Sequence, residues 1–231
     1  MKIALLSDIH ANLQALTAVL RDCERQGVEE FWLLGDYLDY GASGPETVAL
    51  LSSLNASCIL WGNHDGCLFD SEVRSSSTPH GRVAYEYTKQ VAQANPGMMD
   101  WIKSAGQGSS LFLPEKKTLL VHGTPGDPYW GKFTPEGDTE AMFAEMERRD
   151  ITFMLMGHSH VSFLLRKSGR IILNPGSVGQ PRDGCPHAAY GILDDGEIRF
   201  CRVPYDVETA AGEIQKAGLP EYLWKRLYTG S

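Results

Sequence analysis

Five short apolar segments of the chain are each followed at once by side chains that bind metal ions or protons. These side chains are aspartate, asparagine and histidine, and glycines stand among them. The five groups are Asp8-Ile9-His10, Gly35-Asp36-Tyr37-Leu38-Asp39, Gly62-Asn63-His64-Asp65, His122-Gly123 and Gly157-His158-Ser159-His160. Five of the seven histidines fall in these groups, whereas His80 and His187 lie in loops. The repeated position after an apolar strand indicates one shared site.

The donor atoms in these groups predict a transition-metal site. Carboxylate, amide and imidazole donors without a thiolate suit Mn, Fe, Co, Ni or Zn better than Ca or Mg, and we place manganese first. Seven candidate ligands are too many for one tetrahedral zinc ion, but they suit two divalent ions that share a bridging carboxylate. The alternative is that each group is only a polar turn or helix cap. That alternative would leave desolvated charges without partners, with a desolvation penalty of roughly several kcal/mol per ion.

The first half of the chain is expected to position these groups on a parallel sheet. Strands predicted over 3–6, 31–34 and 57–61 alternate with helices over 13–27 and 45–54, an order that implies parallel pairing. In such sheets the loops at the carboxyl ends of the strands converge on one crevice. Residues far apart in the sequence can therefore meet there.

The later part of the chain predicts strands with short connections, and hence more antiparallel pairing. The expected strands cover 118–121, 151–156, 161–166, 170–173, 188–193 and 197–203, with a helix at about 138–149. The turns Lys167-Ser168-Gly169-Arg170 and Asp194-Asp195-Gly196-Glu197 are hairpin signals. The expected fold class is α/β, with two packed mixed β-sheets flanked by helices.

The chain is expected to form a single domain over residues 1–231, because its length suits one large domain or two small ones. Residues 66–110 break the strand–helix alternation and contain two expected helices, at 82–94 and 97–105. We interpret this stretch as an insertion or lid. Residues 204–231 are expected to form a helical tail, which either packs on the body or makes a homo-oligomer contact.

Composition restricts the partners and the location. A net charge of −8 and the lack of a long basic run disfavour nucleic acid and anionic membranes as partners. A small phosphorylated substrate remains compatible, because bound metal reverses the local field. Five cysteines without a C-x-x-C pair predict free thiols in a reducing compartment. The short apolar start is unlike a signal peptide, so we expect a cytoplasmic protein without membrane spans.

The five motifs resemble, in type and order, those of the calcineurin-like metallophosphoesterases, from residue 1 to about 203. The family pattern is D-x-H, G-D-x-x-D, G-N-H-D/E, a lone H and G-H-x-H, and every motif is present here. The segment NPGSVGQPRDG (174–184) is also similar to the small bacterial and archaeal phosphodiesterase-like branch. The resemblance implies a four-layer sandwich in which two mixed sheets pack together with helices outside.

The resemblance also implies a role for each matched residue. One metal would be held by Asp8, His10 and His160, the other by Asn63, His122 and His158, and Asp36 would bridge the two. His64 would be the catalytic histidine rather than a ligand, and Asp39 would orient it. The implied reaction is attack of a metal-bridged hydroxide on phosphorus, with His64 donating a proton to the leaving alkoxide.

The residue after the second aspartate bears on the substrate. In phosphoprotein phosphatases of the family this residue is typically an arginine that grips phosphate, whereas here it is Tyr40. A neutral phenol cannot replace the charged guanidinium fork, so we favour a phosphodiester over a small phosphomonoester. Arg182 either supplies the missing charge or is a surface hairpin residue. Tyr129 and Trp130 either stack on a nucleobase or only pin their loop.

Two further functions stay open at this point. One is a phosphoprotein or nucleotide phosphatase, acting through the same motifs. The other, from a different class, is a non-catalytic interaction module, like the retromer subunit that shares this fold but lacks the catalytic histidine. The presence of His64 and of every expected ligand favours an enzyme.

Overall fold

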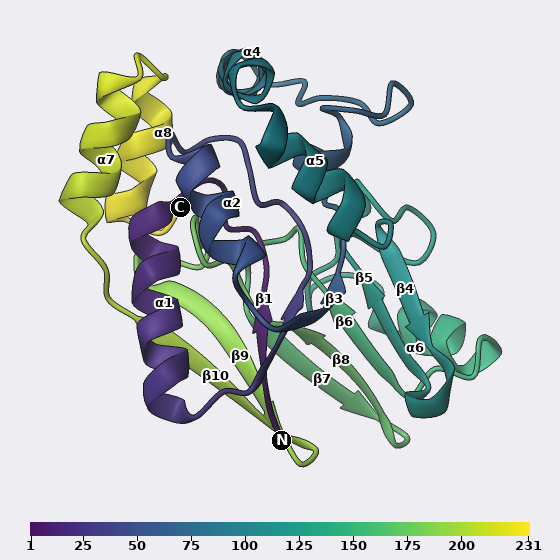
Figure 1. Ribbon diagram of the computed structural model, residues 1–231. Helices are drawn as coiled ribbons and strands as arrows, with labels where there is room; N and C mark the ends of the chain where they lie inside the picture. The colour runs from purple at the N-terminus through teal and green to yellow at the C-terminus, as the bar shows by residue number, and fades with distance from the viewer.

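The computed structural model describes residues 1–231 and contains two five-stranded β-sheets (Figure 1). Their strand orders are β10-β9-β1-β2-β3 and β4-β5-β6-β8-β7. The strands are β1 (Lys2–Leu6), β2 (Glu30–Leu33), β3 (Ala56–Ile59), β4 (Ser110–Leu113), β5 (Thr118–Val121), β6 (Phe153–Met156), β7 (Phe163–Lys167), β8 (Arg170–Asn174), β9 (Ala188–Asp194) and β10 (Glu197–Val203). The α-helices are α1 (Leu13–Gln26), α2 (Gly44–Ser52), α3 (Asn63–Gly66), α4 (Pro79–Ala94), α5 (Pro96–Ala105), α6 (Thr139–Arg148), α7 (Val207–Lys216) and α8 (Glu221–Lys225), with short 3₁₀ turns η1 (Pro114–Lys116) and η2 (Arg226–Tyr228).

The first sheet confirms the parallel arrangement predicted for the first half of the chain. Strands β1, β2 and β3 pair in parallel, and α1 and α2 connect them. Helix α1 begins where the Asn12 side chain accepts from the backbone N–H of Ala15, and it ends at Gly27, whose φ is 70°. The carboxyl ends of these strands therefore lie at one edge of the sheet.

The second sheet is mixed, as predicted, but its central strands pair in parallel where the short connections predicted antiparallel neighbours. Strands β5, β6 and β8 are parallel, and only the edge strands β4 and β7 are antiparallel to their neighbours. The turn at Ser168 and Gly169 has positive φ at both residues, 48° and 75°, which suits a tight hairpin. This hairpin returns β8 alongside β6, so β7 is displaced to the edge. The β9–β10 hairpin was expected and is present, but it joins the first sheet through β1.

The two sheets pack face to face around an apolar core. Alternate residues of β1 point to opposite sides, as a strand requires. Ile3 and Leu5 belong to the cluster between the sheets, and Ala4 and Leu6 to the cluster beneath the helices. The inter-sheet cluster also contains Trp32, Leu34, Leu60, Leu120, Leu155 and Leu173. Helices α1, α2 and α5 cover the outer face of the first sheet, and α6 covers that of the second, which confirms the predicted fold class.

The helices expected within 66–110 are observed as α4 and α5, while the role of this stretch as a lid stays a prediction. The tail forms α7, which packs against α1, and α8, which packs against α7. In Figure 1 this yellow tail lies beside the amino-terminal end of α1. A hydrogen bond of 3.0 Å from Gln14 to Glu213 fixes the contact. The short elements α3, β4 and α8 were not predicted.

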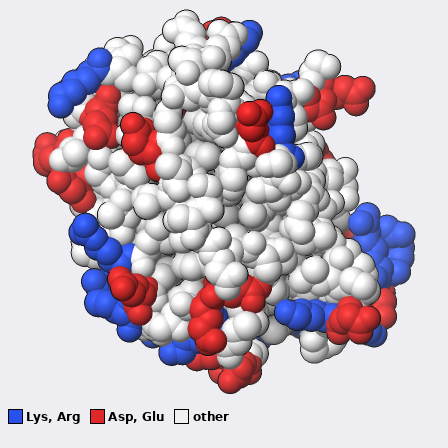
Figure 2. Space-filling model, viewed as in Figure 1, with Lys and Arg blue, Asp and Glu red and all other residues white.

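The surface and the cysteines agree with the composition. Figure 2 shows Lys and Arg interspersed with Asp and Glu around the margin of the face drawn, without a continuous basic stripe. No helix combines the length and the apolar character that a membrane-spanning segment needs. All five cysteines are free thiols, as predicted.

The turn after β1 makes a close contact that generates a stability prediction. The backbone N–H of Gly179 donates to the carbonyl oxygen of Asp8 at 3.0 Å, and a Cβ at Gly179 would collide with the carbonyl oxygen of Ile9. We therefore expect Gly179→Ala to lower the free energy of unfolding by about 1–3 kcal/mol. Gly212→Ala in α7 is the control, because a Cβ there meets nothing within 4 Å; it should stabilise the helix by about 0.5–1 kcal/mol. Urea denaturation measures both, and equal midpoints for the two variants would contradict the expectation.

Candidate metal centre

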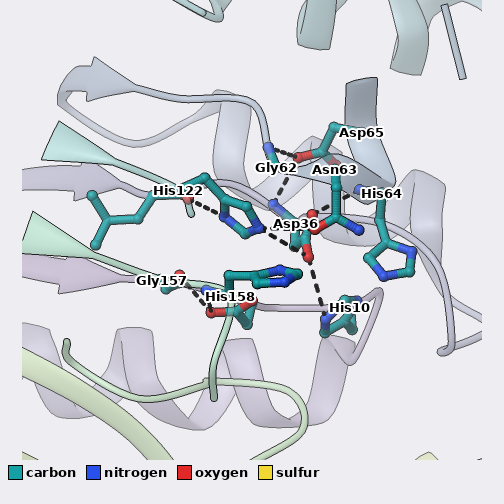
Figure 3. Close-up of polar contacts among 12 residues, drawn as sticks. His10, Asp36, Gly62, Asn63, His64, Asp65, His122, Gly157 and His158 are labelled. Carbon is teal, nitrogen blue, oxygen red and sulfur yellow. Dashed lines mark hydrogen bonds and ion pairs between the residues drawn. The ribbon is translucent and has the colours of Figure 1, made fainter. Parts of the chain in front are cut away.

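The five sequence groups meet at one place, where β1, β2, β3, β5 and β6 end (Figure 3). The structure brings together all seven predicted ligands, Asp8, His10, Asp36, Asn63, His122, His158 and His160, and places His64 beside them. All of these except His158 are buried, and His158 is half-buried. Burying this many ionisable side chains costs free energy unless each one has a hydrogen-bonding, charged or metal partner.

The ligand atoms form two groups. Those of Asp8, His10 and His160 lie within 4.8 Å of one another, and so do those of Asp36, His122 and His158. Asn63 joins the second group, since its Oδ1 lies 3.1 Å from Nε2 of His122.

Asp36 lies between the two groups. Its Oδ2 is 3.3 Å from Nε2 of His122 in the second group and 3.8 Å from Nε2 of His10 in the first. This carboxylate is therefore within reach of both groups, which is the position that a bridging ligand requires.

The first group fits a metal ion. Nδ1 of His10 lies 3.0 Å from the Leu38 carbonyl oxygen and Nδ1 of His160 lies 2.6 Å from that of Gln180, so both rings carry their proton on Nδ1. The two Nε2 lone pairs then face each other at 3.2 Å. Burial lowers the pKa of both rings, and the charge of Arg182 lowers that of His160 further, so neither ring is protonated at neutral pH. Facing lone pairs, beside an Asp8 Oδ1 that has no hydrogen-bond donor, suit a cation between them.

The second group also converges on a cation position. Nδ1 of His122 donates to the Leu34 carbonyl oxygen at 2.7 Å, so its Nε2 faces the oxygens of Asp36 and Asn63. Burial lowers the pKa of His122, but the Asp36 carboxylate outweighs it and raises the pKa to about 9. Burial and the charge of His122 lower the pKa of His158 to about 3, which leaves that ring neutral. The space between these donors takes either a proton or a metal ion, and a metal must displace the proton.

The backbone at the site is strained. Seven of the eleven predicted site residues have positive φ, between 49° and 72°: Asp8, His10, Asp36, Asp39, Tyr40, His158 and His160. Such conformations cost of order 1–3 kcal/mol each when the residue is not glycine, and they cluster at functional sites. The turns support one another, because the N–H groups of Ile9 and His10 both donate to the Asp36 carbonyl oxygen, at 2.8 and 3.0 Å.

His64 is held by Asp39 and stands among aromatic rings. Its Nδ1 lies 2.6 Å from Oδ2 of Asp39. Burial lowers the pKa of His64, but the carboxylates of Asp36 and Asp39 outweigh it, so the pKa is raised above its usual value. The ring of Tyr40 lies 4.6 Å from that of His64, and the ring of Trp130 lies 6.2 Å away. Trp130 is also 5.8 Å from the ring of His158, so it lines the site.

Arg182 lies next to the centre rather than on a remote surface. Its backbone N–H donates to the carbonyl oxygen of His160 at 3.2 Å. Its charge lowers the pKa of His160 and opposes the raised pKa of His64. The guanidinium is thus within electrostatic reach of both sides of the site.

Asp65 holds the turns together, a role that the sequence did not assign. Its carboxylate accepts from the backbone N–H groups of Asp36 at 2.7 Å, Tyr37 at 3.0 Å and Gly62 at 3.0 Å. It thereby joins the turn after β2 to the turn after β3. The only sequence feature that pointed to Asp65 was its place in the Gly62–Asp65 motif. Its hydrogen-bond partners are backbone N–H groups, which every residue type except proline has, so the sequence does not identify them.

The segment after β8 supports the other side of the centre. The Asn174 amide donates to the Gly157 carbonyl oxygen at 2.6 Å and to Ser159 Oγ at 3.0 Å. Ser177 Oγ donates to the carbonyl oxygen of Asp8 at 2.6 Å. This segment therefore fixes the turns that carry Asp8, His158 and His160.

The family model for the calcineurin-like phosphoesterase superfamily domain matches residues 1–196. The chain belongs to the calcineurin-like phosphoesterase superfamily. The members of this superfamily are metal-dependent, in agreement with the donor geometry of the two groups.

Several relatives of this phosphoesterase chain share its sequence or its fold. Over 99% of the chain it is 34% identical to the uncharacterized protein MJ0912 of Methanocaldococcus jannaschii, of which it covers 98%. Over 84% it is 27% identical to the phosphodiesterase YfcE of Escherichia coli K12, of which 88% is covered. The crystal structure of a metallophosphoesterase from Sphaerobacter thermophilus matches with a TM-score of 0.84 and 32% identity, over 100% of this chain and 99% of that one.

The carboxylate of Asp65 generates a prediction about metal affinity. Asp65→Asn replaces one acceptor oxygen by an amide donor that faces backbone N–H groups. We expect stability to fall by about 1–3 kcal/mol and the affinity for Mn²⁺ to fall with it, because the turn that carries Asp36 loosens. Asp100→Asn, at an exposed position, is the control. Melting temperatures with and without Mn²⁺ measure both effects, and a full Mn²⁺-induced shift in Asp65→Asn would contradict the assigned role.

Proposed function

We propose that this phosphoesterase is a dinuclear metal-dependent phosphodiesterase with manganese as its metal. The observation that supports this most directly is the position of the Asp36 carboxylate, within 4 Å of donors from both ligand groups. Asp8, His10 and His160 would hold one ion, Asn63, His122 and His158 the other, and Asp36 would bridge them. Two divalent ions would act as Lewis acids on the phosphoryl oxygens and would lower the pKa of a water molecule.

His64 is suited to donate a proton to the leaving group. The raised pKa favours the imidazolium near neutral pH. Asp39 occupies Nδ1 at 2.6 Å, so the proton that remains available is the one on Nε2. The backbone N–H of His64 donates to Oδ1 of Asp36 at 2.9 Å, which holds the backbone of His64 beside the ligand groups. We assign His64 as the general acid and Asp39 as the residue that orients it.

Tyr40 favours a diester over a monoester. Burial and the Asp39 carboxylate raise the pKa of its phenol to about 12, so the group is neutral at physiological pH. The neutral side chain of Tyr40 packs between the rings of His10 and His64. It offers no positive charge to compensate the second negative charge of a phosphomonoester. A phosphodiester carries a single negative charge and needs less compensation. The 27% identity to a protein named phosphodiesterase points the same way.

Removing the imidazole tests the assignment of the acid. We expect His64→Ala to lower kcat on bis-p-nitrophenyl phosphate by about 10²–10⁴-fold while the metal content stays unchanged. His187→Ala, at an exposed loop position, is the matched control and should retain full activity. Asp39→Asn should lower kcat in the wild type but add little in the His64→Ala background, because it acts through His64. Unchanged turnover in His64→Ala, or full additivity in the double variant, would contradict these roles.

A pair of substrates tests the diesterase preference. We expect kcat/KM for bis-p-nitrophenyl phosphate to exceed that for p-nitrophenyl phosphate at saturating Mn²⁺, because Tyr40 stays neutral beside the phosphate. A clear preference for the monoester would favour a nucleotide or phosphoprotein phosphatase instead. Absence of both activities in fully Mn²⁺-loaded protein would favour a non-catalytic interaction module.

A further inference from the structure

The carboxylate behind His64 has a hydrogen-bond donor that comes from outside the two sheets. Thr88 lies in α4, within the stretch 66–110 that interrupts the strand–helix alternation, and only 5% of its surface is exposed. Its Oγ1 donates to Oδ1 of Asp39 at 3.3 Å. In Figure 1 helix α4 lies at the top, beyond the ends of the strands. A segment that contributes no strand therefore touches the residue assigned to orient the acid.

Both oxygens of the Asp39 carboxylate take part in hydrogen bonds. Oδ2 lies 2.6 Å from Nδ1 of His64, and Oδ1 accepts from the backbone N–H of Tyr40 at 2.9 Å as well as from Thr88. Tyr40 is the next residue in the chain, so its bond fixes the carboxylate only relative to its own turn. The bond from Thr88 comes from a different element and fixes the carboxylate relative to the body of the protein.

Two tyrosines of α4 hold the helix in the position that this bond requires. Tyr87 Oη donates to the carbonyl oxygen of Ala42 at 3.2 Å, and Tyr85 Oη donates to that of Cys67 at 3.3 Å. Ala42 follows the aspartate by three residues, and Cys67 follows the histidine by three. The helix is therefore bound to the loop of each member of the pair, and the position of Thr88 follows from these contacts.

The face of α4 that carries Thr88 is packed into the protein. Ala84, one helical turn before Thr88, is fully buried in an apolar cluster that also contains Tyr40 and the tail residues Ala210 and Leu223. In such a buried interface a carboxylate oxygen that loses its donor does not regain one from bulk water, so the loss costs more than at the surface. The hydroxyl of Thr88 therefore has an effect on the carboxylate that solvent cannot supply.

Building on the phosphodiesterase function proposed above, we infer that Thr88 is a positioning residue whose hydroxyl holds Asp39 in the orientation that presents Nε2 of His64 to the leaving group. Thr88 does not touch the substrate and acts only through Asp39. A catalytic side chain is precise only when the groups behind it are themselves held by hydrogen bonds and packing. The stretch 66–110 would then be a fixed support of the proton donor, with Thr88, Asp39 and His64 forming one hydrogen-bonded chain.

Removing the hydroxyl without changing the shape of the side chain tests the role in the Mn²⁺-loaded enzyme. We expect Thr88→Val to lower kcat on bis-p-nitrophenyl phosphate by about three- to tenfold, with KM and metal content unchanged, and Thr88→Ser to restore most of the loss. Thr47→Val in α2 is the matched control, because Thr47 is also buried but its hydroxyl has no hydrogen-bond partner. It should leave kcat unchanged. Full kcat in Thr88→Val, or a loss that Thr88→Ser does not restore, would overturn the inference.

A second background shows whether Thr88 acts through the imidazole. In His64→Ala the proton donor is absent, so adding Thr88→Val should lower kcat no further. The same loss in the wild-type and His64→Ala backgrounds would show that Thr88 acts by another route and would overturn the inference. If Thr88→Val fails to fold, Thr88→Ala gives the same test.

A spectroscopic measurement separates the positioning role from the catalytic proposal. Proton NMR of the protein loaded with diamagnetic Zn²⁺ needs no turnover, and the Nδ1 proton of His64, held 2.6 Å from Asp39, should give a downfield resonance that His64→Ala removes. We expect the resonance to persist in Thr88→Ser and to be lost by exchange with water in Thr88→Val. That result in a protein without hydrolytic activity would support the positioning role and refute the diesterase. An unchanged resonance in Thr88→Val, together with hydrolysis of the diester, would do the reverse.

Discussion

The rest of the site depends on the position of the Asp36 carboxylate. It lies between two groups of ligands, each of which combines side chains from both sheets, and its own backbone position is set by Asp65. It also accepts from the backbone N–H of His64, so the same side chain contacts the ligand groups and the residue proposed as the acid. A shift of Asp36 would therefore disturb both ligand groups and the proposed proton donor together.

The turns that position this carboxylate and its neighbours have strained backbone conformations. Asp8, Asp36 and His160 lie in turns with positive φ. The cost is offset by the inter-sheet core directly beneath, where Leu5, Leu34 and Leu155 are fully buried. Carbonyl oxygens then orient the imidazoles of His10, His122 and His160, because each of these three rings has a backbone acceptor for its Nδ1–H and its Nε2 is left to face the centre. Ligand geometry thus follows from strand register and turn shape.

The sequence predicted which side chains converge, because their signal is local: an apolar strand followed by Asp, Asn or His. It also predicted the three parallel strands and the hairpins. It was wrong about the pairing of β6 within the second sheet, since the placement of β8 beside β6 depends on how the β7–β8 hairpin returns across the sheet. Asp65 acts on backbone atoms, and the carboxyl-terminal tail is fixed on the loop after β8 by the hydrogen bond from Gly184 to Gly230. Such long-range contacts have no periodic pattern, so the sequence alone could not reveal them.

Electron paramagnetic resonance of the Mn²⁺-loaded protein tests the central claim, that two ions share Asp36. If the claim holds, titration of Mn²⁺ into metal-free protein gives the spectrum of an exchange-coupled pair, and Asp36→Ala abolishes the coupling. The spectrum of isolated, uncoupled Mn²⁺ at saturation would contradict a bridged dinuclear centre.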